Sequence, residues 1–340
     1  MTETLLQAYF PLFAWTGLGV ILCRFLPDSF PRLLGRGLYW VGVPLEILAL
    51  TRRTQFSTQT GLVPLVTVTL LAIGFCFAWL SLQVIQWSVA REPAVVKSSL
   101  DDPVCFPDQM LQATALGWSD RSRQGAFLLS SILGNTGFVG LAIVPAFVSA
   151  PYLGWVVIYG VTHNLLGTYG FGVLISSYFS RQVPAGRWWL IVRDVLTVPS
   201  LWAFALGTVT HSFTLPTQLE AGLQASVWLV IPTALLLMGM RVSQLQGWKS
   251  LRLAIVPAVL KVVLLPSLTG LILTLIGITN DGRLTLVLMA GMPTAFAGLI
   301  LAEEYELDRE LISSSIVLTT VMLIIMIPLW LFLFKTSIAS

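Results

Sequence analysis

An interrupted apolar run constrains the fold of this chain most. The run extends from Gly125 to Val148, and its centre, Gly134–Leu141, reads Gly-Asn-Thr-Gly-Phe-Val-Gly-Leu. Glycine, Asn and Thr are poor helix formers, and each backbone group left without a hydrogen bond in hydrocarbon costs several kcal/mol. A helix break at this depth is therefore stable only where protein or a cavity surrounds it. The run predicts a membrane helix that is broken at a site.

A second stretch repeats this pattern later in the chain. Met292–Leu299 reads Met-Pro-Thr-Ala-Phe-Ala-Gly-Leu, and a shift of 158 residues aligns it with the first stretch. The shift places Thr136 on Thr294, Phe138 on Phe296, Gly140 on Gly298 and Leu141 on Leu299. Two interrupted membrane helices at corresponding places in two halves of a chain indicate the binding site of a transporter.

Composition assigns the chain to the integral membrane proteins. Of its 340 residues 56% are hydrophobic and 10% are charged, whereas soluble domains carry about 25% charged residues. A helix needs about 20 apolar residues to cross a bilayer. We predict an all-α membrane protein with ten transmembrane helices, near Leu5–Leu26, Arg36–Leu50, Gly61–Val89, Arg123–Val148, Tyr152–Phe179, Asp194–Phe213, Leu223–Met240, Leu253–Ile278, Leu284–Leu301 and Leu311–Phe334.

The distribution of basic residues predicts the orientation. If the N-terminus lies outside, most of the 19 Lys and Arg residues fall in inside loops, and only Arg52, Arg53, Arg283 and Lys335 fall outside. Inside loops of membrane proteins are enriched in Lys and Arg. The N-terminal Met-Thr-Glu-Thr lacks the basic region of a signal peptide, so the first run is expected to be retained. We expect a multi-pass protein of the cell (inner) membrane with both termini outside.

The two halves of the chain resemble each other over more than the interrupted stretches. A shift of 188 residues pairs Pro11 with Pro199, Gly19 with Gly207, Trp40 with Trp228 and Pro44 with Pro232. Because five spans are an odd number, the second half must enter the membrane from the opposite side, which makes an inverted repeat. We predict a first repeat at residues 1–180, a cytoplasmic linker at 181–193 and a second repeat at 194–340. Chance coincidence of Pro and Gly is the alternative.

The two breaks supply the predicted substrate-binding residues. Pro293 lacks an N–H and ends the helix that precedes it. Half-helix N-termini at the breaks carry partial positive charge, which suits an anionic group such as a carboxylate. The alternative is that the glycines only allow helices to pack closely. The predicted binding residues are Asn135, Thr136, Gly137, Pro293, Thr294 and Ala295, with the N–H groups near Gly137 and Ala295 as donors.

Four other polar residues lie inside predicted spans. Lys261 is a cation in a membrane helix, which is a functional candidate by default; it attracts an anion, pairs with a carboxylate or extends toward the inner surface. Glu46 is a proton site, the partner of a base, or a hydrated side chain near the outside. His163, beside Asn164, relays protons or is a hydrogen-bonded structural residue. We include Lys261 in the binding set and name Glu46, His163 and Asn164 as candidates for ion coupling.

Several function classes lack support in the sequence. Cys23, Cys76 and Cys105 have no metal-ligand spacing, and we predict no metal site. The chain has no P-loop and no HExxH motif, and its basic residues lie in short loops, which argues against a nucleic-acid partner. We expect no enzymatic activity and no cofactor, so that transport would depend on a substrate, proton or sodium gradient.

The motifs together resemble a known family. Gly134–Gly140, Gly291–Ala295 and Ile327–Leu329 are similar to stretches of the auxin efflux carrier family of permeases, which includes the plant PIN proteins and is related to the bile acid/sodium symporters. The resemblance covers nearly the whole chain. It implies two inverted five-helix repeats, a scaffold of helices 1, 2, 6 and 7, a transport domain of helices 3–5 and 8–10, and a homodimer. It also implies an elevator motion and an organic anion bound beside Asn135 and Pro293.

The sequence therefore favours a secondary transporter that moves a small organic anion, auxin-like or another carboxylate, by alternating access. A sodium-coupled symporter of the bile-acid type is the nearest alternative. A membrane sensor or receptor that does not transport is the alternative from another class. The expected partners are the substrate, the lipid bilayer and a second copy of the chain.

Overall fold

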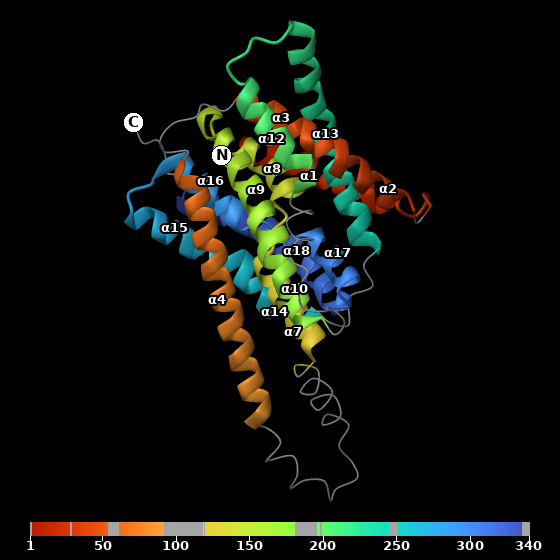
Figure 1. Ribbon diagram of the computed structural model, residues 1–340, viewed down its shortest axis with the longest axis vertical. Helices are drawn as coiled ribbons and strands as arrows, with labels where there is room; N and C mark the ends of the chain where they lie inside the picture. Colours follow the sequence, from red (N-terminus) through yellow and green to blue (C-terminus); the bar gives the residue numbers. More distant parts are fainter. Residues whose placement is uncertain are drawn as a thin grey trace, which may run out of the picture.

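The fold consists of helices, as the sequence predicts. The computed structural model describes residues 2–27, 29–53, 61–91, 118, 120–180, 196–197, 199–244 and 251–334, and within them every regular element is helical (Figure 1). The predicted linker at 181–193 and most of the loop before Trp118 lie outside the described residues. The all-α membrane class is therefore confirmed for the part of the chain that the structure describes.

Helices of the first half correspond to the predicted runs. In order they are α1 (Thr2–Leu22), α2 (Phe30–Gly37), η1 (Leu38–Gly42), α3 (Val43–Arg52), α4 (Leu62–Arg91), α7 (Arg121–Ile132), η3 (Thr136–Gly140), α8 (Leu141–Ile143), η4 (Val144–Ala146), η5 (Ala150–Tyr152), α9 (Leu153–Thr162), η6 (His163–Gly172) and α10 (Val173–Phe179). Among the η segments, η4 and η5 are 3₁₀ turns and the others are π-helical.

Helices of the second half follow in order along the chain. They are α12 (Pro199–Thr210), α13 (Thr217–Gln244), α14 (Leu251–Val259), the π-helical η7 (Leu260–Leu264), α15 (Leu265–Leu275), α16 (Asn280–Ala290), α17 (Phe296–Glu304) and α18 (Arg309–Phe334). In both halves one predicted run folds as two pieces: α7 and η3 in the first, α16 and α17 in the second.

Five helical segments of the described chain are long and apolar enough to cross a membrane. They are Phe30–Arg52, Leu62–Ser88, Thr217–Gln244, Leu251–Leu275 and Arg309–Phe334. The other predicted runs fold as shorter or interrupted helices. Apolar side chains such as Trp228 (82% exposed) and Phe10 (71% exposed) lie on the outer surface of the molecule, as expected for a protein that lipid surrounds.

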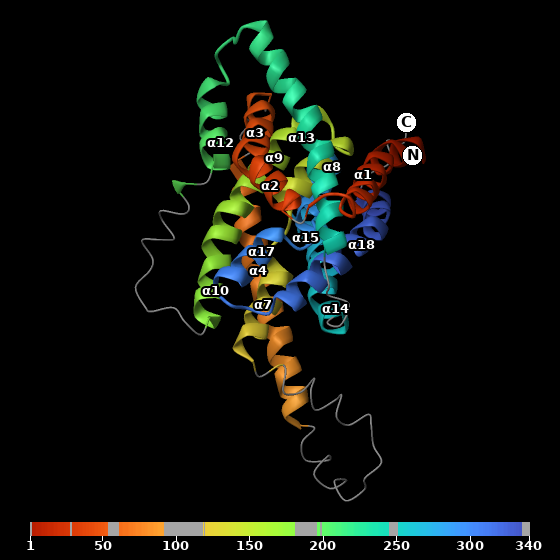
Figure 2. The same cartoon turned by 90° about the vertical axis from the view of Figure 1, so that its right-hand side faces the viewer.

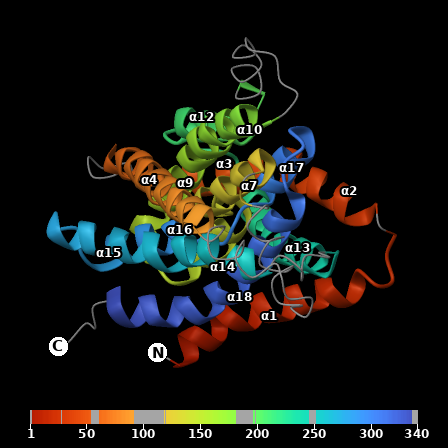
Figure 3. The same ribbon diagram turned by 90° about the horizontal axis from the view of Figure 1, so that it is seen from below.

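The helices pack in two groups. One group contains α1, α2, α3, α12 and α13, in which α1 packs on α13 and α3 packs on α12 and α13. The other contains α4, α7, α10, η6 and the helices from α14 to α18, while η1 packs with the first group. In this group α7 packs against both α4 and α17, and Figure 3 shows α7 between them. In Figure 2 and Figure 3 α1 begins and α18 ends on the same side of the molecule.

Glycine permits the closest helix contact of the first group. A Cβ at Gly19 in α1 would lie 3.1 Å from the Cα of Gly239 in α13 and would overlap the carbonyl of Leu236. A Cβ at Gly239 would in turn overlap the carbonyl of Thr16. Small residues let membrane helices approach until their backbones touch, so this pair fixes how α1 lies against α13.

Candidate functional site

The two broken helices cross each other at their breaks. In the first half α7 ends at Ile132 and η3 begins at Thr136; in the second α16 ends at Ala290 and α17 begins at Phe296. The connecting segments run antiparallel. The N–H of Asn135 donates to the carbonyl of Pro293 at 2.7 Å, and the N–H of Ala295 donates to the carbonyl of Leu133 at 2.9 Å. Backbone groups that the breaks leave open therefore satisfy one another. We call this region the crossing: residues 133–136 and 291–295.

Side chains of the two motifs hold the crossing in place. Asn135 is the N-cap of the second half-helix, and its Oδ1 accepts the N–H of Phe138 at 3.3 Å, as capping residues do. The Oγ1 of Thr294 donates to the carbonyl of Ser130 at 2.9 Å. The N–H of Thr294 donates to the Oγ1 of Thr319 at 3.0 Å, which ties the crossing to α18. Asn and Thr are thus required for local structural reasons at these positions.

Lys261 and His163 both lie next to Gly134. The Lys261 side chain is 1% exposed, and its Nζ donates to the carbonyl of Ala290, the last residue of α16, at 3.1 Å. A cation at a helix C-terminus is favourable because it opposes the helix dipole. The Nε2 of His163 accepts the N–H of Gly134 at 3.4 Å. A Cβ at Gly134 would lie 2.9 Å from the Lys261 Nζ, so a larger residue there would require the Lys261 side chain to shift.

Several polar groups at the crossing have no hydrogen-bond partner within the described chain. Buried atoms of this kind are the Oγ1 of Thr136, the Oγ of Ser130 and the Nδ1 of His163. The backbone N–H groups of Phe296 and Ala297, in the first turn of α17, also donate to no described residue. Unpaired buried polar groups are costly. These donors and acceptors are available to a polar ligand.

Two details refine the sequence-based prediction. The sequence predicted donors near Ala295; the Ala295 N–H itself donates to Leu133 across the crossing, and the free donors of that half-helix are one and two residues further on. Glu46 is 2% exposed on α3, and no hydrogen bond of the crossing among the described residues involves it. Asn164 does join the site, because its Nδ2 lies 2.9 Å from where a Cβ on Gly137 would be.

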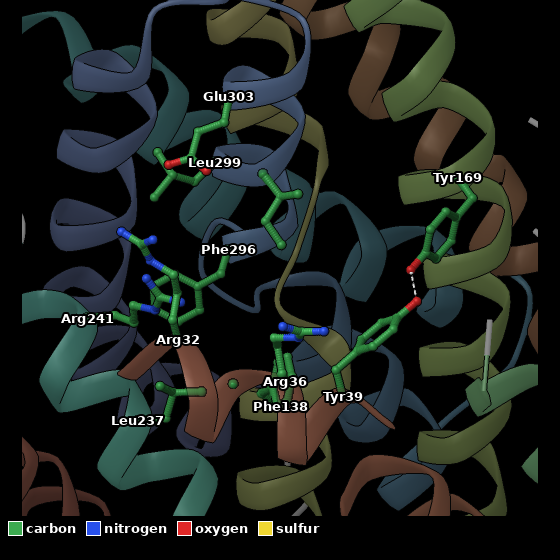
Figure 4. A pocket seen from close by; sticks show the side chains of 12 residues that line it. Arg32, Arg36, Tyr39, Phe138, Tyr169, Leu237, Arg241, Phe296, Leu299 and Glu303 are labelled. Atoms are coloured by element: carbon green, nitrogen blue, oxygen red, sulfur yellow. Dashed lines mark hydrogen bonds between the residues drawn. The ribbon is translucent and has the colours of Figure 1, made fainter. Parts of the chain in front are cut away.

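A cavity of about 460 Å³ opens beside the crossing. Its wall nearest the crossing contains Phe138 and Phe296, the two phenylalanines that the shift of 158 residues aligns. Its other lining residues are Arg32, Gly35, Arg36, Tyr39, Tyr169, Leu237, Arg241, Leu299, Ile300 and Glu303. Figure 4 shows Arg32 and Arg241 together below Glu303, and Arg36 beside Tyr39.

The sequence did not predict this cavity. From the sequence alone we predicted only that Arg32, Arg36 and Arg241 are basic residues on the inner side of the membrane. They lie on α2 and α13, while Glu303 lies on α17, so the two groups of helices face each other across the cavity. The hydroxyl groups of Tyr39 and Tyr169 are hydrogen-bonded to each other across the same boundary.

The π-helical segments coincide with the site. Thr136 to Phe138 lie in η3, His163, Asn164 and Tyr169 in η6, Lys261 in η7 and Tyr39 in η1. π-Helical turns are rare and are frequent at functional sites. No group of three or more His, Cys, Asp or Glu residues gathers into a metal-binding cluster within the described ranges.

Known proteins similar to this chain are transporters. Residues 187–331 match the family model described as "Membrane transport protein". An uncharacterized transporter of Methanothermobacter thermautotrophicus is 24% identical over 216 residues, which cover 62% of this chain and 68% of that protein. An uncharacterized transporter of Methanocaldococcus jannaschii is 25% identical over 211 residues, covering 61% of this chain and 67% of that protein. These matches bear out the predicted resemblance to a family of membrane transport proteins.

Proposed function

We propose that this protein is a secondary active transporter that carries a small organic anion across the cell (inner) membrane by alternating access. The crossing is the observation that carries the proposal. It combines two half-helices, unpaired polar groups and a neighbouring cavity, and transporters bind substrate at such discontinuous helices. The alternative that its glycines serve only close helix packing does not account for the unpaired Thr136 and His163 atoms.

An anion is the substrate that suits the site. Free N–H groups in the first turn of α17 favour negative charge, and Lys261 adds a positive charge behind the crossing. Asn135, Thr136 and the N–H of Gly137 would contact the substrate from the first half. Pro293 and Thr294 would keep the second half-helix in position.

We further propose an inverted repeat of five helices, with residues 181–193 as the link between the repeats. A contact pattern supports it. Gly19 packs on Gly239, and the shift of 188 residues relates this pair to Gly207 and Thr51, which also pack together, with a Gly207 Cβ 2.8 Å from the Thr51 Cβ. Equivalent residues thus make equivalent contacts in the two halves, as a two-fold repeat requires.

The two groups of helices support an elevator-type mechanism. The first group matches the proposed scaffold of helices 1, 2, 6 and 7, and the second contains the crossing. Rigid movement of the second group against the first would carry the site across the membrane. A homodimer formed through the scaffold, with both termini outside, is part of the same proposal.

Coupling to a proton or sodium gradient belongs to the proposal as well. His163 is the coupling candidate closest to the crossing, and Asn164 adjoins it. Glu46, which is buried and has an unpaired Oε1 within the described residues, is a candidate within the scaffold. Uptake measured with choline in place of sodium separates a proton-coupled carrier from a sodium symporter of the bile-acid type.

Transport by the purified protein tests the proposal. A thermal-shift screen against organic acids selects the substrate, and uptake is then measured in proteoliposomes. We expect Asn135→Ala to lose binding and uptake, whereas Gln218→Ala, which changes an exposed residue of α13, retains both. Equal binding and uptake by Asn135→Ala would contradict the site. A sensor would bind the same ligand without accumulating it in the vesicles.

A further inference from the structure

The cavity beside the crossing contains more positive than negative charge. Its charged lining residues are three arginines, Arg32, Arg36 and Arg241, and one carboxylate, Glu303. No described residue forms a hydrogen bond or an ion pair with any of the three guanidinium groups. Arginines held elsewhere in the fold differ in this respect: Arg123 pairs with Asp308 at 2.8 Å, and Arg52 pairs with Glu220 at 3.4 Å. Among the described residues, the three arginines of the cavity therefore have no carboxylate within ion-pair distance, unlike Arg123 and Arg52.

We propose that this cavity binds a small anion with two negative charges, held by Arg32, Arg36 and Arg241, and that Glu303 determines the required charge. This inference rests on the proposed transport function and names its substrate class. Three guanidinium groups and one carboxylate leave two positive charges, which a dianion balances. Guanidinium groups bind carboxylate and phosphate oxygens in bidentate fashion, with geometry that lysine does not offer. Both a dicarboxylate and a phosphate group have this chemistry.

The volume and the lining of the cavity limit the size and the chemistry of the anion that it can bind. A volume of about 460 Å³ lies at the lower end of the range for small-molecule sites. Phe138, Phe296, Tyr39 and Tyr169 provide aromatic walls. The anion therefore has a small body with apolar surface between or beside its charges.

The charged residues of the cavity belong to both groups of helices, so binding of the anion would affect how the two groups lie against each other. Arg32 and Arg36 belong to α2 and Arg241 to α13, whereas Glu303 follows the crossing on α17. A dianion bound by the arginines would lie between the two groups of helices and in contact with Phe296 at the start of α17. The carboxylate of Glu303 is the only negative charge among the described lining residues, so it competes with the substrate for the arginines.

Binding to the purified protein tests the charge requirement. The protein is placed in nanodiscs of phosphatidylcholine, and calorimetry measures the affinity for succinate, inorganic phosphate at mildly alkaline pH, and butyrate. We expect at least one of the two dianions to bind about tenfold or more tightly than butyrate, because butyrate has the carbon chain of succinate and one charge fewer. Equal affinity for butyrate, or no binding of either dianion, would overturn the proposal.

Variants of the lining residues give the second readout. We expect Arg32→Gln, Arg36→Gln and Arg241→Gln each to weaken dianion binding about tenfold or more. Arg309→Gln, at the exposed start of α18, is the matched control and should bind as wild type does. Glu303→Gln should bind the dianion more tightly and should also accept the trianion citrate. Unchanged binding in all three arginine variants, with unfolding temperatures that show intact protein, would contradict the assignment.

A lipid headgroup is the other source of such an anion. If the arginines bind phospholipid, the protein in nanodiscs that contain phosphatidylglycerol should no longer bind the soluble dianion. This outcome would contradict the proposal that the ligand is a soluble anion. A separate outcome tests the proposed function. If the protein binds the dianion in nanodiscs but shows no uptake in proteoliposomes, the binding site is supported and the transport function is contradicted.

Discussion

The crossing and the cavity beside it are built in opposite ways. At the crossing, polar atoms are buried, and most of them are satisfied by hydrogen bonds within the chain, such as those between Asn135 and Pro293 and between Thr294 and Ser130. In the cavity, Arg32 and Arg36 are exposed and unpaired within the described residues. The crossing is thus preorganised by the fold, while the cavity keeps its charges available to a ligand.

This difference suggests a division of work between the two regions. A preorganised backbone positions a substrate without losing free energy to reorganisation when the substrate binds. Exposed arginines attract an anion from solution and contribute to selection by charge. Substitutions at the crossing should therefore affect folding and transport together, whereas substitutions in the cavity should affect binding more than folding.

The largest effect is expected from a side chain at the crossing. Gly134→Val would place atoms within van der Waals distance of the Lys261 ammonium, because a Cβ there lies 2.9 Å from Nζ and 3.0 Å from Cε. Overpacking of this kind costs about 1–3 kcal/mol, and we expect transport to be abolished. Gly222→Val is the control, since nothing lies within 4 Å of a Cβ there. Normal uptake by Gly134→Val would show that the crossing tolerates distortion.

The charge behind the crossing is expected to matter for transport and not for stability. Lys261→Met removes a buried ammonium, which relieves a desolvation cost of several kcal/mol, and leaves the Ala290 carbonyl without its partner at a cost of about 1–3 kcal/mol. We therefore expect an unfolding temperature equal to or above that of wild type, with uptake reduced at least about tenfold. Leu264→Met in the same π-helical segment is the control. Wild-type uptake by Lys261→Met would assign this lysine a structural role alone.

A smaller loss is expected where one hydrogen bond supports the crossing. Thr294→Val keeps the shape of the side chain and removes the donor to the Ser130 carbonyl, which should lower the free energy of unfolding by about 1–2 kcal/mol. Thr208→Val changes an exposed threonine whose hydroxyl bonds only to its own helix and should be close to neutral. Equal losses in chemical denaturation would mean that the crossing has no special dependence on Thr294.

The sequence predicted the crossing because its cause is local. Asn, Thr and Pro in an apolar run are unfavourable in a lipid-facing helix wherever the rest of the chain lies, so the interruption itself identified Asn135 and Pro293. Local composition could not reveal that the Ala295 N–H donates to a carbonyl on the other side of the crossing, because this bond depends on how two segments 158 residues apart align.

The cavity was missed for a related reason. Arg32 and Arg241 are far apart in the sequence, and arginines at the inner ends of membrane helices are common. No local pattern distinguishes these from Arg24 or Arg252. Only the packing of α2 on α13, with α17 opposite, gathers them around one space. A signal was nonetheless present, since Phe138 and Phe296 align between the halves and both line the cavity.

The smallest effect is expected from the loss of a single hydrogen bond between the two helix groups. Tyr39 in η1 and Tyr169 in η6 join the groups through their hydroxyls, so the bond holds only while the groups keep their present positions. Tyr39→Phe removes a bond worth about 0.5–1.5 kcal/mol, which is enough to shift the balance between two transport conformations a few-fold. We expect a change of that size in the uptake rate, with substrate affinity in the cavity nearly constant. Tyr152→Phe, at a ring that packs edge-on against Trp155, should leave the rate unchanged. If Tyr39→Phe instead lowers the substrate affinity and leaves the uptake rate unchanged, the Tyr39 hydroxyl binds the substrate in the cavity. The cavity would then use a side chain that the fold already holds by a hydrogen bond, as the crossing does.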